Sequence, residues 1–151
     1  MGFLDKLKGA VKFVTGGAAK VTLEFQPQQA FPGDKILVKV SATSTGGEVK
    51  SKGAFIDLLG REEVEIKQGG TVNQHVHVTH ETLEQAFPIS GEFVLAANET
   101  KLFEGAVQLP ATCLPTYQGH YAKHVWQLRA RVEASGTDPS SDYVVLRVGL
   151  K

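Results

Sequence analysis

From residue 20 onward, apolar and polar side chains alternate along most of the chain. This is the period of a strand with one buried and one wet face. Glycine, proline and polar turn residues interrupt the alternation at intervals, and no helical stretch separates the strands. Such a pattern is typical of an antiparallel, immunoglobulin-like β-sandwich of about seven to eight strands. The predicted inward positions are Val21, Leu23, Phe25, Ile36, Val38, Val40, Ala42, Ala54, Ile56, Leu58, Val144, Leu146 and Val148.

The clearest alternation lies between residues 122 and 132, after a segment broken by Pro110 and Pro115. Proline cannot donate to a sheet ladder, so this broken segment is expected to cross between the two sheets. Trp126 has the inward parity and is expected to be buried between the sheets. The inward set is Ala122, His124, Trp126, Leu128, Ala130 and Val132, and the outward set is Lys123, Val125, Gln127, Arg129 and Arg131.

Two other regions are less regular. The strand at residues 54–58 is bracketed by Gly53 and Gly60, with a short hairpin expected at residues 62–67. Residues 80–91 mix apolar and polar positions without a clear period, and the prediction for them is a loop.

The first residues have a helical period instead. Phe3, Leu4 and Leu7 fall on one side of a helix, and the glycines at 16 and 17 would end it. We therefore expect a short amphipathic helix over residues 1–17, followed by one sandwich domain over residues 18–151. The helix is expected to pack on its own domain or on a second copy of the chain. The alternative is that residues 1–15 lie on a membrane surface.

Composition narrows the function classes. Lysine plus arginine and aspartate plus glutamate both total 16, so no bulk field favours nucleic acid, and none is predicted as a partner. The one cysteine, Cys113, excludes an intramolecular disulfide. The sequence shows no cleavable signal pattern and no long apolar run, so the expected location is the cytoplasm.

Histidines provide the strongest alternative chemistry. His75 and His77 lie two residues apart on a predicted strand, and His80 follows as a third possible ligand for zinc or nickel. The competing interpretation is that these histidines occupy the wet face of a strand, and no metal or other cofactor is predicted. His120 and His124 lie near the start of the next clear strand and are expected to bond the backbone.

Catalysis has little support in the sequence. Cys113 is flanked by Thr112 and Leu114, where a buried, unreactive thiol is expected. The chain has no nucleophile-elbow, phosphate-loop or paired-carboxylate signature. No catalytic residue is predicted, and the chain is expected not to be an enzyme.

Three motifs together resemble the amino-terminal lobe of the arrestin-like family. The first is Leu109-Pro110 followed by Leu114-Pro115-Thr116-Tyr117-Gln118-Gly119 and then Val125-Trp126-Gln127-Leu128-Arg129-Ala130. The second is Phe31-Pro32-Gly33-Asp34 before an alternating strand, and the third is residues 54–60 ending in glycine. The amphipathic start and the residues Gly16-Gly17-Ala18-Ala19-Lys20-Val21 look most like sporulation-control-type relatives from bacteria and archaea.

The resemblance covers roughly residues 20–150 and implies a single arrestin-like β-sandwich lobe. It implies a non-enzymatic adaptor or scaffold that binds other proteins, by a sheet edge or an outer face. Arrestins proper pair two such lobes, so nothing that depends on a second lobe carries over. A homodimer is also expected as a possible arrangement, because an open sandwich has sheet edges to cover.

Overall fold

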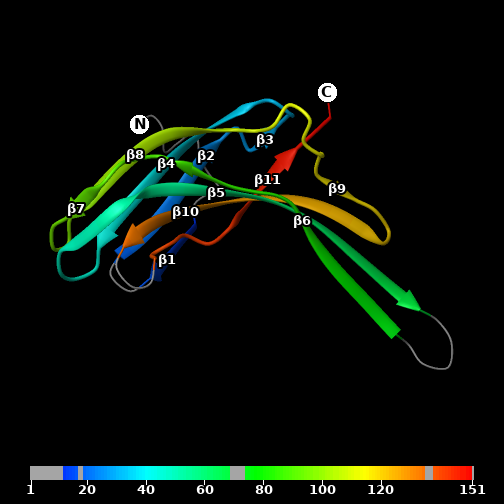
Figure 1. Ribbon diagram of the computed structural model, residues 1–151, viewed down its shortest axis with the longest axis horizontal. Helices are drawn as coiled ribbons and strands as arrows, with labels where there is room; N and C mark the ends of the chain where they lie inside the picture. Colours follow the sequence, from blue (N-terminus) through cyan, green and yellow to red (C-terminus); the bar gives the residue numbers. More distant parts are fainter. Residues whose placement is uncertain (1–11, 17–18, 69–73, 135–137, 151) are drawn as a thin grey trace.

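The computed structural model describes residues 12–16, 19–68, 74–134 and 138–150, and within them regular structure consists of the strands β1 to β11 (Figure 1). The strands form two antiparallel sheets, apart from a short parallel pair between β3 and β11. The smaller sheet has the order β1-β2-β4-β8. Its strands are β1 (Lys12–Gly16), β2 (Ala19–Gln26), β4 (Lys35–Ser44) and β8 (Thr100–Gln108).

The larger sheet has the order β3-β11-β10-β5-β6, with β7 paired to β5 and β9 paired to β10. Its strands are β3 (Gln29–Ala30), β5 (Val49–Gln68), β6 (Gln74–Pro88), β7 (Phe93–Leu95), β9 (Tyr117–Gln118), β10 (Ala122–Ala134) and β11 (Val144–Val148). The inner faces of the two sheets share one hydrophobic core. The β-sandwich fold class predicted from the alternation is therefore confirmed, although the described residues form eleven strands and not about seven to eight.

The predicted inward positions are also confirmed. Burial alternates along β4, β10 and β11, so every second side chain of each strand faces the core. Trp126 is the largest fully buried side chain, at 1% exposure. The turn predicted before β4 forms as well: Gly33 has a φ of 87°, and the Phe31 amide donates to the Asp34 carboxylate. Glycine adopts this left-handed backbone without steric cost.

The predicted amino-terminal helix is wrong over Lys12–Gly16, which form strand β1, so the sandwich already begins before residue 18. The other residues of the predicted helix lie outside the described part of the chain. β1 pairs antiparallel with β2, with Gly16 opposite Ala19 and Lys12 opposite Leu23. A short apolar segment fits both a helical and a strand period, and here an available sheet partner determines which forms. Among the described residues, the structure contains no helix of the length and apolarity that would cross a membrane.

The predictions for residues 54–91 were partly wrong. β5 does not end at Gly60 but continues to Gln68, and the expected loop at residues 80–91 is strand as far as Pro88. A β-bulge explains the second error, because Gly60 pairs with Leu83 while Arg61 pairs with Glu81. The extra residue shifts the inward positions of β6 from even to odd numbers. The strand therefore shows no continuous two-residue period in the sequence.

Candidate functional site

Strand β6 is the last strand of the larger sheet within the described residues. It pairs with β5 along its whole length, and no described strand pairs with its other edge. An open edge presents backbone donors and acceptors that another chain can bind. β6 is 15 residues long, which makes it a candidate protein-interaction site.

The distal parts of β5 and β6 form a hairpin that extends from the sandwich (Figure 1). We call residues 62–68 and 74–81 the arm. The middle of one face of the arm is apolar and exposed, with Ile66 opposite Val76 in register and Val64 opposite Val78. Three of these side chains have substantial exposure: Ile66 at 41%, Val76 at 38% and Val78 at 54%. Exposed apolar side chains gathered beside an open edge are a feature of binding surfaces.

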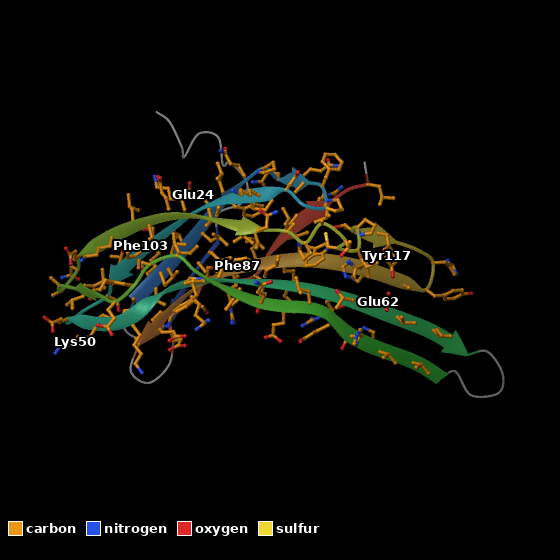
Figure 2. The ribbon with its side chains drawn as sticks, turned by 45° about the horizontal axis from the view of Figure 1, so that its top comes forward. Glu24, Lys50, Glu62, Phe87, Phe103 and Tyr117 are labelled. Carbon is orange, nitrogen blue, oxygen red and sulfur yellow. The ribbon has the colours of Figure 1, made fainter. Side chains whose placement is uncertain are left out.

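The arm is held from its β5 side. The amide of Glu65 donates to the carbonyl of Tyr121 at 2.7 Å, and the Tyr117 hydroxyl donates to Glu62 at 2.7 Å (Figure 2). The Tyr117 bond raises the pKa of that phenol, because the acceptor is a carboxylate. Lys123 also pairs with Glu63 at 3.0 Å. All of these contacts come from β9, β10 and the residues between them, so they fix the arm while leaving the edge of β6 open.

The base of the arm is organised by the bulged residue Thr82. Its hydroxyl lies 2.7 Å from Nε2 of His124, which belongs to β10 on the far side of β5. Gly60 of β5 lies between them, and a Cβ added there would lie 2.7 Å from Thr82 Oγ1 and 3.0 Å from the Trp126 ring. The absence of a side chain at Gly60 is what allows Thr82 to contact His124.

His124 has 0% exposure, and its two ring nitrogens have different partners. Nδ1 lies 3.1 Å from the Pro115 carbonyl, which only accepts, so Nδ1 carries the proton. In the neutral ring, Nε2 then accepts from the Thr82 hydroxyl. Burial lowers the pKa of His124, and the Pro115 bond and nearby Glu62 oppose that effect only in part. The neutral ring thus connects β6, β10 and the crossing segment before β9.

This burial predicts a pH dependence of stability. The unfolded histidine titrates near a pKa of about 6.5, and the folded His124 titrates lower, so the unfolded state binds more protons between the two values. The contribution of His124 to the free energy of unfolding has its full value above about pH 6.5, and it decreases as the pH drops toward the pKa of the folded state. Urea unfolding measured across this pH range should show a smaller decrease in the free energy of unfolding for His124→Gln than for the unmodified chain. His120→Gln, at an exposed position, is the matched control, and an unchanged slope in the His124→Gln variant would contradict the assignment.

The proline-containing segment at residues 110–116 is held as its sequence predicts, at a crossing between the sheets. The indole Nε1 of Trp126 donates to the Leu114 carbonyl at 2.7 Å. The Thr116 amide donates to the carbonyl of Val148 at 2.7 Å, and the Val148 amide donates to Thr116 Oγ1 at 3.0 Å. Cys113 is half-buried against the core, and burial raises the pKa of its thiol. A raised pKa disfavours the thiolate, so this thiol is not activated as a nucleophile.

Two of the three histidines weighed as metal ligands, His77 and His80, do not converge. His77 lies opposite Glu65 and His80 opposite Glu62, in an uninterrupted register, so their side chains project from opposite faces of β6. The side chain of His75 lies outside the described residues. Among the residues that the structure describes, no group of three or more histidine, cysteine or acidic side chains is arranged to hold a metal ion. The backbone bond predicted for His124 is confirmed, whereas His120 is exposed and contacts Tyr121 edge-on.

A polar cluster around Asp57, on the outer face of the larger sheet, could not be predicted from the alternation of apolar and polar residues. Asp57 accepts from Arg129 at 2.8 Å and from Arg131 at 3.1 Å, although its side chain is only 12% exposed. The two guanidinium groups also cover the rings of Tyr143 and Phe55. The outward parity of these residues was visible in the sequence, but the register that places Asp57 opposite Arg129 was not. The arginine donors are used within the cluster, so we assign it a structural role on this face.

Comparison with known proteins gives information on the fold. No protein-family model matches the chain, and no curated protein sequence matches it. The solved structure of Spo0M, a sporulation control protein from Bacillus subtilis, matches 88% of this chain with a TM-score of 0.61 and 21% identity. The match covers 50% of the Spo0M chain, so this chain spans about half the length of that protein.

A family 123 glycoside hydrolase from Clostridium perfringens matches 82% of this chain and 22% of its own, with a TM-score of 0.42 and 12% identity. A likeness of that size supports no argument about this chain. The Spo0M match agrees with the motifs around Pro110, Pro115 and Trp126. The chain therefore has an arrestin-like β-sandwich fold of the Spo0M type.

Proposed function

We propose that this chain is a non-enzymatic scaffold lobe that binds an extended segment of another protein along the open edge of β6. The main observation is the edge itself: over residues 74–88 it contains no lysine or arginine, and its one proline is the last residue. Proteins commonly protect exposed edges with lysine, proline or bulges. Here the bulge lies at the base of the arm, within β6, so the arm portion of β6 has neither a bulge nor a lysine or proline.

The contacts at the base of the arm also support this proposal. Strand addition uses main-chain hydrogen bonds for affinity, and it costs less entropy when the receiving strand is already ordered. The bonds from Tyr117, Tyr121 and Thr82 hold β5 and β6 in place from the body of the sandwich. The binding edge is therefore formed before any partner arrives.

The proposal is tested by placing a charge on the edge. Val78→Lys introduces a cation at a position that is 54% exposed, on the strand that would receive the partner. Val145→Lys, at 55% exposure on β11, is the matched control. We expect a partner captured from the native host by the unmodified chain and by Val145→Lys to be lost with Val78→Lys. Equal capture of that partner by both variants, each confirmed to be folded by its unfolding transition, would show that β6 is not the binding edge.

A further inference from the structure

We infer that the segment accepted by β6 alternates apolar and basic side chains, an inference that rests on the function proposed above. The charged residues of β6 are all acidic, apart from its histidines. Glu81 and Glu84 are both exposed. They lie opposite Arg61 and Leu59 in the register with β5, and both project from the outer face of the sheet. The acidic groups nearest to a strand added on that face are therefore those of Glu81 and Glu84, and both carry negative charge.

The basic residues of this region lie farther from the edge. Arg61 and Lys67 belong to β5, one strand away, and Lys123 belongs to β10, two strands away, where it pairs with Glu63. Opposite charges on neighbouring strands stabilise a sheet, whereas like charges directly opposite destabilise it. A strand beside β6 is consequently favoured when it places lysine or arginine on the outer face.

The other face of the same edge selects for apolar side chains. Val76 and Val78 project from it beside Val64 and Ile66, and these two pairs in register make an apolar patch in the middle of the arm. A side chain added next to this patch is removed from water, which stabilises the complex in proportion to the apolar area buried. Because successive residues of a strand face opposite sides, the partner that satisfies both faces alternates apolar and basic residues.

Charge also argues against a second copy of this chain as the occupant of the edge. Another β6 strand would bring two more exposed glutamates and no lysine or arginine to the shared edge. The acidic edge is thus better matched by a basic strand than by itself.

The test uses three synthetic peptides of about eight residues, each with a fluorescent label and each read by anisotropy with the full chain. One peptide alternates valine and lysine, one alternates valine and glutamate, and one has four valines followed by four lysines. We expect the alternating valine–lysine peptide to bind at least about tenfold tighter than the other two, with affinity that falls as salt rises. Removing both acids with Glu81→Gln and Glu84→Gln should weaken the binding of the valine–lysine peptide about two- to tenfold. The control is Glu92→Gln with Glu104→Gln, which removes two exposed acids elsewhere and should leave the affinity unchanged.

The other outcomes separate this inference from the function on which it rests. If the valine–glutamate peptide binds as tightly as the valine–lysine peptide, the inference about charge is overturned. If the block peptide does so, the inference about alternation is overturned. Either result would leave the proposal of strand addition unaffected. Failure of all three peptides, while Val78→Lys still abolishes capture of a host protein, would also overturn only this inference. Failure of the peptides together with unchanged capture would overturn both. A concentration-dependent dimer in sedimentation that Val78→Lys dissociates would identify a second copy as the occupant and overturn the basic partner.

Discussion

Replacing Trp126 by alanine is expected to lower the free energy of unfolding by about 3–5 kcal/mol, as large-to-small changes of a buried aromatic residue do. The side chain is 1% exposed and fills the space beside Gly60. Its removal leaves a cavity and also takes the hydrogen bond from the Leu114 carbonyl. The crossing segment before β9 thus loses a fixed contact together with part of its apolar support.

Chemical denaturation of the variant and the unmodified chain measures this effect. Tyr121→Ala, at a side chain that is 58% exposed, is the aromatic control and is expected to change the free energy of unfolding by less than about 1 kcal/mol. Trp126→Phe keeps most of the apolar volume but not the indole donor, so it should fall between alanine and tryptophan. A loss below about 1 kcal/mol for Trp126→Ala would show that the sandwich does not depend on this residue.

The second large effect is expected at Gly60. In Gly60→Ala the new Cβ would lie 2.7 Å from Thr82 Oγ1 and 3.0 Å from two carbons of the Trp126 ring, so side chains on both neighbouring strands have to move. Overpacking of this kind costs about 1–3 kcal/mol. The matched control is Gly46→Ala, because a Cβ there has no atom within 4 Å and the residue lies in a turn.

A double-mutant cycle distinguishes the ring contact from a general effect of the substitution. Trp126→Phe removes the ring carbons that crowd position 60, so Gly60→Ala should cost less in that background, with a coupling of about 0.5–3 kcal/mol. Additive costs would mean that the contact with the tryptophan ring does not matter. Gly60→Ala should also weaken partner binding at β6, because the new Cβ would displace Thr82, which connects the bulge of that strand to His124.

The fold class followed from local sequence because a strand that is buried on one face carries its period in its own residues. Residues 122–132 show this well: mostly hydrophobic side chains at even positions and mostly polar ones at odd positions correctly predicted both faces of β10. The turn at Phe31–Asp34 was equally predictable, since glycine and proline have backbone preferences that do not depend on distant contacts. The motifs on Pro110, Pro115 and Trp126 added the arrestin-like topology.

The errors have a different physical origin. Lys12–Gly16 fit a helical period, but pairing with β2 makes them a strand. Residues 80–88 lose their apparent period because one bulged residue exchanges the two faces of β6. His77 and His80 are close in sequence, yet they have opposite parity in a continuous register and cannot share a metal ion.

The sequence by itself therefore determined which side chains of the regularly alternating strands face the core, where the turn at Phe31–Asp34 lies and which large residue is buried, because these follow from local periodicity and backbone sterics. Only the tertiary structure decided the strand neighbours, the bulge at Thr82 and the register that brings Asp57 to its arginines. It also decided that β6 has no neighbour on its outer edge among the described strands, and that the arm is held by contacts from β9 and β10. Strand order and register depend on contacts between residues far apart in the chain, and no local pattern specifies them.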